Sequence, residues 1–118
     1  MFTVRNTILA AIAGILGCIV NSLAIAAIAG GDPLPLILSA GRQFWSIVFA
    51  MALIPIFARM SGVTAWIAGF LVLNALASLS AVYIWGAAAP WSFVLTVNGA
   101  YALVAVVVYA LAPNTNQL

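Results

Sequence analysis

One cation lies in the middle of an apolar stretch of this chain. Arg42 is one of only four charged residues among 118. A guanidinium in apolar surroundings is suited to bind carboxylate or phosphate, because its planar array of N–H donors matches the oxygens of those anions. Gln43 follows it directly, and Ser46 lies one helical turn further along. These three residues are therefore the candidate contact for an anionic headgroup or for a carboxylate of a partner protein.

Two other interpretations of Arg42 stay open on sequence alone. An arginine at the centre of a membrane span costs about 2.5–3.5 kcal/mol on insertion scales, so a long side chain near a span end extends towards the lipid headgroups instead. Arg42 would then pair with Asp32 across the preceding loop. Alternatively, the second span begins later, and residues 33–41 lie in the membrane interface.

Amide and hydroxyl side chains form a second candidate group. Asn21, Asn74, Ser78 and Asn98 each interrupt an apolar run. Such side chains form hydrogen bonds between membrane helices and fix their register, contributing about 0.6–2 kcal/mol each. This predicts a role in intramembrane polar packing. The alternative is that they line one pocket for a polar ligand.

The composition excludes most catalytic chemistry. The chain has no His, no Lys and no Glu, which are the usual general acids and bases. One cysteine, Cys18, and one aspartate do not provide a transition-metal ligand set. We therefore expect no catalytic residue, no metal, no cofactor and no enzyme activity. Three arginines also form no basic face, so nucleic acid is not an expected partner.

The elements that must position these residues are membrane spans. Hydrophobic residues make up 68% of the chain and charged residues 3%, whereas an average soluble domain is about 25% charged. A bilayer core needs roughly 20 apolar residues per helix, and Gly- or Pro-containing breaks separate four such runs. The prediction is an all-α polytopic membrane protein, one domain over residues 1–118 that forms an up-down bundle. Its expected spans are residues 8–29, 36–58, 63–85 and 91–112, with Pro55 bending the second.

Charge and aromatic residues predict the orientation. Arg5 and Arg59 fall at the same side of the predicted spans and Asp32 at the other, so the positive-inside rule places both termini in the cytoplasm of a bacterium. Residues 8–29 are interpreted as a span rather than as a cleaved signal peptide. Tryptophans favour the membrane interface, and the expected anchors are Trp45, Trp66, Trp85 and Trp91.

Small residues on the first span predict close helix packing. Ala10, Gly14, Gly17 and Ala24 follow a spacing of three and four residues and share one helix face with Asn21. Membrane helices associate through such faces, because lipid offers them no hydrophobic reason to pair. This face is the expected contact with the other spans.

Three functions follow from these features. Small-residue faces, few charges and short loops favour an accessory or structural subunit within a larger membrane protein complex. A small oligomeric transporter or channel is an alternative, although the first span lacks the acidic residue on which four-helix exporters depend. Binding of a lipid or quinone in the polar zone is a third. The expected partners are membrane lipids, other membrane subunits and, in a homo-oligomer, copies of the chain.

The layout also resembles uncharacterised families of small bacterial four-helix membrane proteins. The resemblance covers about Arg5 to Ala112 and lies in three stretches: residues 10–13 leading to Asn21, the second span ending in Ala58-Arg59, and residues 104–106 of the last span. It implies a four-span bundle and a bacterial inner membrane. It transfers no catalytic or binding residue.

Overall fold

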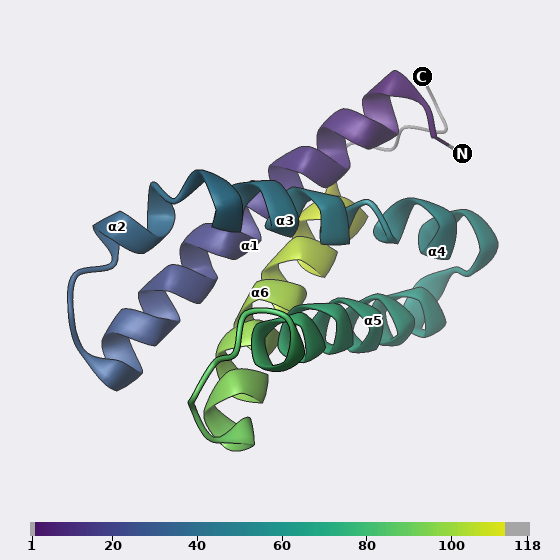
Figure 1. The fold of residues 1–118 in the computed structure, drawn as a ribbon. Helices are drawn as coiled ribbons and strands as arrows, with labels where there is room; N and C mark the ends of the chain where they lie inside the picture. The colour runs from purple at the N-terminus through teal and green to yellow at the C-terminus, as the bar shows by residue number, and fades with distance from the viewer. Residues whose placement is uncertain (1, 113–118) are drawn as a thin grey trace.

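The computed structural model describes residues 2–112, and within them it contains helices and no strand. Four helical stretches are long and apolar enough to cross a membrane. The expected all-α four-helix fold is thereby confirmed (Figure 1). The elements are α1 (Val4–Ala29), α2 (Leu34–Ile37), α3 (Ala40–Ala50), α4 (Leu53–Arg59), α5 (Gly62–Tyr83) and α6 (Trp91–Leu111).

The second span differs from the expected single helix over residues 36–58. A short helix, α2, ends before Ser39, whose extended backbone starts α3 at Ala40. The hydroxyl of Ser39 accepts a hydrogen bond from the backbone N–H of Arg42, as N-cap residues do. The span is therefore Ala40–Arg59. This start agrees with the alternative in which the preceding residues lie outside the span.

A second break divides this span into α3 and α4. It falls at residues 51–52, about one turn before Pro55. Because proline has no N–H, it cannot donate to the carbonyl of Met51, and its ring crowds that carbonyl. The Met51 carbonyl instead accepts from Ile54 at 3.1 Å, in a tighter turn. The break lies where the bend at Pro55 was expected.

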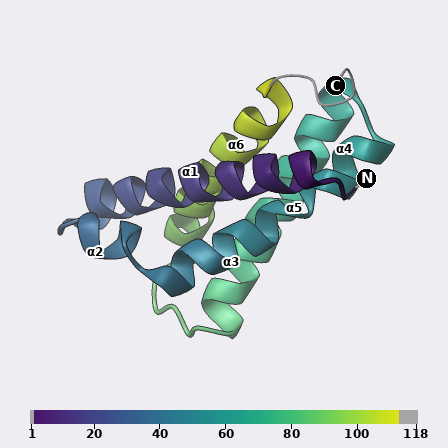
Figure 2. The same cartoon turned by 90° about the horizontal axis from the view of Figure 1, so that it is seen from above.

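The four spans form a ring in which each is antiparallel to its neighbours. α1 and α6 make the most extensive contact, followed by α5 with α6 and α1 with α3. Figure 2 shows α1 crossing α6, and in Figure 1 α3 lies above α5. The seam between α3 and α5 is the loosest of the four.

Glycines on α1 allow the close contacts. A Cβ at Gly14 would lie 2.6 Å from the carbonyl oxygen of Ser46 on α3, and one at Gly17 would lie 2.6 Å from the ring of Tyr101 on α6. On the same face, Ala10 is buried and Ala24 is partly buried. The small-residue face of α1 thus contacts two spans at once.

The apolar core occupies the half of the bundle near the start of α1 and the end of α6. Its buried members come from every span and are Ala13, Leu53, Leu73, Tyr101, Ala102, Ala105 and Val106. Leu53 and Val106 close around Gly69, where a Cβ would lie 3.0 Å from each. The intramembrane polar groups lie in the other half, so the two ends of the bundle differ in chemistry.

Candidate functional site

Arg42 points into the bundle. One terminal nitrogen, Nη2, donates to the side-chain oxygen of Asn21 at 2.6 Å and to the hydroxyl of Ser22 at 3.1 Å, both on α1. Its Nε donates to the carbonyl oxygen of Leu36, in α2, at 3.2 Å. The cap at Ser39 places Arg42 in the first turn of α3, and the packing of α3 against α1 turns the Arg42 side chain towards α1.

The snorkelling interpretation with Asp32 as partner differs from this geometry. The Asp32 carboxylate accepts from the backbone N–H of Leu34 at 3.0 Å. Within residues 2–112, Asp32 forms no ion pair with Arg42.

The side chain of Gln43 does not follow that of Arg42 towards α1 and instead donates to the carbonyl of Ile37 at 2.9 Å. Its own side-chain oxygen is buried without a hydrogen-bond partner among the described residues.

The three asparagines continue the hydrogen bonds of Arg42 across the bundle. Asn21, only 6% exposed, donates to the Val97 carbonyl at 2.7 Å and to the Asn98 side chain at 3.0 Å, both on α6. Asn98 donates at 3.3 Å to Ser78 of α5.

The chain of donors ends on α5 and α6. Ser78 donates to Asn74 at 2.9 Å, and Asn74 donates to the Leu95 carbonyl of α6 at 3.4 Å. The network from Arg42 to Leu95 therefore joins all four spans, and every donor points away from the arginine. Such a chain of amide dipoles is polarised by the charge at its start and stabilises that charge.

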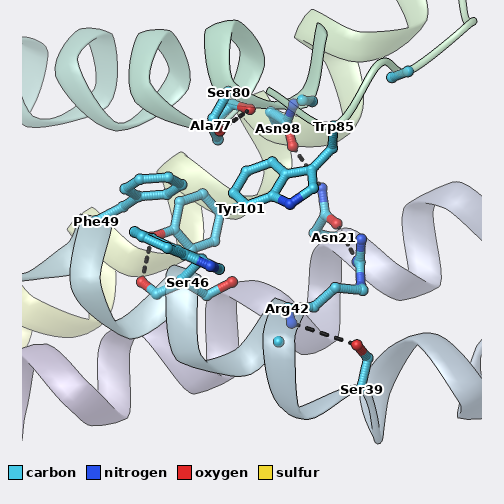
Figure 3. A pocket seen from close by; sticks show the side chains of 14 residues that line it. Asn21, Ser39, Arg42, Ser46, Phe49, Ala77, Ser80, Trp85, Asn98 and Tyr101 are labelled. Atoms are coloured by element: carbon cyan, nitrogen blue, oxygen red, sulfur yellow. Dashed lines mark hydrogen bonds between the residues drawn. The ribbon is translucent and has the colours of Figure 1, made fainter. Parts of the chain in front are cut away.

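A cavity of about 480 Å³ lies beside this network. Figure 3 shows Asn21, Arg42 and Asn98 on one wall and the rings of Phe49, Trp85 and Tyr101 on others. All spans contribute to its lining, which is Asn21, Ser39, Gly41, Arg42, Trp45, Ser46, Phe49, Ala77, Ser80, Ala81, Trp85, Ala87, Asn98 and Tyr101.

Aromatic rings bridge the loose seam next to the cavity. The ring centroids of Trp45 on α3 and Trp85, after α5, are 5.7 Å apart, and Trp45 also lies 5.9 Å from Phe49. Both tryptophans stay about half exposed. Of the other expected anchors, Trp91 contacts Tyr83, and Trp66 packs against the buried core. Trp45 and Trp85 thus line the cavity and are also exposed at the surface of the bundle.

The sequence patterns did not indicate three of the residues in this site. Tyr101 donates to the Ser46 carbonyl at 2.6 Å and so ties α6 to α3. Ser22 and Ser39 hold Arg42 in place. A serine directly before a helical stretch is a common N-cap, so Ser39 could have been recognised as the start of the helix. Tyr101 stands in an apolar run with nothing in its neighbourhood to mark it.

The lining of the cavity combines features that suit ligand binding. It carries one positive charge, several hydrogen-bond donors and a wall of aromatic rings. No cluster of three potential metal-ligating His, Cys, Asp or Glu side chains occurs in the described part of the chain.

No family model, curated protein or solved structure matches this chain. The resemblance to small bacterial four-helix families therefore stays a prediction.

Proposed function

We propose that this protein is a multi-pass membrane protein that binds a small amphipathic molecule, a lipid or a quinone, in its cavity. The observation that carries the proposal is the cavity itself. Its volume of about 480 Å³ falls within the roughly 300–1,000 Å³ of small-molecule sites. Such sites combine a mainly apolar lining with a few placed polar groups, and here Arg42, Asn21 and Asn98 supply those groups.

Access from the bilayer supports a membrane-dissolved ligand. α3 and α5 make few contacts with each other, whereas α1 packs closely against both α3 and α6. A ligand that enters between α3 and α5 passes the rings of Trp45 and Trp85 and reaches Arg42 without crossing water. Aromatic side chains suit this position, because one end of an indole is apolar and the other donates a hydrogen bond.

For the location, the proposal is a bacterial cytoplasmic membrane with both termini in the cytoplasm. Its support is that Arg5 and Arg59 lie at one end of the antiparallel spans, while Asp32 lies beyond the other. The cavity then lies in the outer half of the membrane.

The accessory-subunit hypothesis stays a prediction alongside this proposal. The outward faces of the spans are apolar, and such faces can pack against lipid or against other helices. Ligand binding and membership of a complex do not exclude each other. The transporter alternative has less support, because the one intramembrane charge is held by α1 and α2.

A cavity-filling substitution tests the proposed function. Ala81→Leu on α5 adds apolar volume at a residue that lines the cavity. Ala75→Leu adds the same volume on the exposed face of the same helix and serves as the control. The purified full chain is heated in detergent with phosphatidylglycerol, phosphatidylcholine or decylubiquinone at increasing concentrations.

A ligand at about 100 times its Kd stabilises the folded state by about 2.7 kcal/mol. We expect a saturable rise in melting temperature with at least one of these molecules for the native chain and for Ala75→Leu. The rise should be lost in Ala81→Leu. An equal response in both variants would show that the molecules act on the lipid-facing surface, and the proposed function would be wrong.

A further inference from the structure

We infer that the group bound beside Arg42 is an anion, a phosphate or carboxylate, held by the guanidinium of Arg42 and the indole N–H of Trp85. This inference rests on the proposed function and names the chemistry of its ligand. The two residues come from opposite sides of the loose seam, α3 and the segment after α5, and both line the cavity.

The first argument concerns the donors of Arg42. Its Nη2 and Nε are engaged with Asn21, Ser22 and Leu36. Its second terminal nitrogen, Nη1, has no hydrogen bond to any residue between 2 and 112. The protein therefore occupies the edge of the guanidinium formed by Nε and Nη2, and the N–H donors of Nη1 are left for a ligand. Charged N–H donors of this kind form strong, charge-assisted hydrogen bonds with carboxylate and phosphate oxygens.

The second argument concerns charge. Every hydrogen-bond partner of Arg42 is a neutral amide, hydroxyl or carbonyl oxygen. Asp32 is the only acidic residue of the whole chain, and its carboxylate is engaged at the start of α2. Buried or half-buried charges in proteins are normally paired. A ligand with a negative charge supplies the counter-charge that residues 2–112 do not bring to this place.

The third argument concerns Trp85. Its indole ring lies beside Asn21 on the side of the cavity that Arg42 faces (Figure 3). The ring is 52% exposed, and its N–H forms no hydrogen bond with the described residues, so this donor is available to a ligand at the mouth of the cavity. An oxygen bound by Arg42 would be its partner. Ring contact with Trp45 holds the indole at the cavity.

Fluorescence of the two cavity tryptophans provides the test. Trp66→Phe and Trp91→Phe are introduced together into the full chain, so that Trp45 and Trp85 are the only tryptophans left. This protein is placed in phosphatidylcholine nanodiscs. Four probes are titrated separately: phosphatidylglycerol, a long-chain fatty acid, inorganic phosphate and decylubiquinone. The first two are lipid anions, the third is a soluble anion and the last is uncharged.

We expect saturable fluorescence changes with an anion, weakening as ionic strength rises because added salt screens charge. Arg42→Gln should weaken this binding at least about tenfold, since a charge-assisted hydrogen bond is lost. Arg42→Lys, which keeps the charge, should weaken it less. Trp85→Phe should weaken anion binding about threefold, measured by the fluorescence of Trp45. This substitution leaves the hydrogen bonds of Arg42 intact. Arg5→Gln is the control for charge and should bind as the native chain does. Saturation by phosphatidylglycerol or fatty acid identifies a lipid anion, and saturation by inorganic phosphate identifies a soluble one.

Two results would overturn the inference. In the first, folded Arg42→Gln and Trp85→Phe both bind the anions as tightly as the native chain. In the second, decylubiquinone alone saturates the site, without dependence on salt; the cavity then binds a neutral ligand, and the proposed function survives. If none of the four probes saturates, the proposed function fails together with the inference.

Discussion

α1 and α3 pack closely at Gly14. Replacing Gly14 with alanine has two opposing effects on stability: a gain in helix propensity and a steric overlap with α3. In a helix interior, alanine is favoured over glycine by about 1 kcal/mol. Against this, the new Cβ would lie 2.6 Å from the Ser46 carbonyl oxygen and 2.8 Å from the Cα of Ile47. Both neighbours are backbone atoms, so no side chain can rotate away. The helix α3 itself must move.

The size of the effect follows from these distances. Ordinary Cβ contacts begin at 3.4 Å, so the shortest one requires a displacement of about 0.8 Å. Overpacking a rigid interface costs about 1–3 kcal/mol, and occasionally more. After the gain in helix propensity is subtracted, we expect Gly14→Ala to lower the free energy of unfolding by up to about 2 kcal/mol. The displacement also separates Arg42 from Asn21, so ligand binding should weaken as well.

Gly41→Ala is the matched control. Gly41 lies in the helix α3, and no atom lies within 4 Å of the Cβ it would gain. The same substitution should there raise the free energy of unfolding, by up to about 1 kcal/mol. Unfolding in mixed micelles by titration with a denaturing detergent measures both variants. If the two substitutions change stability in the same direction, the close contact of α1 with α3 is not what fixes the bundle.

Four further substitutions test the polar network and the break in the second span. Asn21→Leu removes three hydrogen bonds and leaves the charge of Arg42 without its main partner, so it should lower the unfolding free energy by about 2–4 kcal/mol. Asn74→Leu removes longer contacts and should lower the unfolding free energy by about 1 kcal/mol or less. Equal losses in the same unfolding titration would contradict the central place of Asn21. Tyr101→Phe deletes the buried hydrogen bond to α3 and should cost about 1 kcal/mol; no change in stability would show that this bond contributes nothing. Pro55→Ala restores a backbone donor, so amide exchange at residues 51–56 should slow as α3 and α4 merge; unchanged exchange would assign the break to packing instead.

The number and limits of the spans could be predicted because they depend on local properties. Runs of apolar residues and Gly- or Pro-containing breaks are read along the chain, and the observed helices α5 and α6 begin and end within two residues of the expected ones. The break before Pro55 is equally local, since it follows from a missing N–H. The second span was harder because its start depends on one serine. Leu36 and Ile37 are apolar enough for a span, yet Ser39 caps the helix.

The site could be predicted only in part. Arg42, Asn21 and Asn98 were recognisable as polar residues in apolar runs, and the spacing on α1 placed Asn21 on the packing face. The direction of Arg42 depends on how α3 rotates about its axis against α1, which the sequence near Arg42 does not specify. The cavity depends on the loose seam between α3 and α5, and that is a property of all four helices together.

The uneven closure of the helix ring has a mechanical consequence. Where α1 packs against α3 and α6, backbone and ring atoms already lie in close contact with Gly14 and Gly17. These helices therefore cannot move closer together. A change in the cross-section of the bundle would therefore occur mainly by separation of α3 and α5, while α1 and α6 stay together as a rigid pair. A bound molecule would exchange sideways with the surrounding lipid there, and lateral pressure in the bilayer would set how readily it leaves.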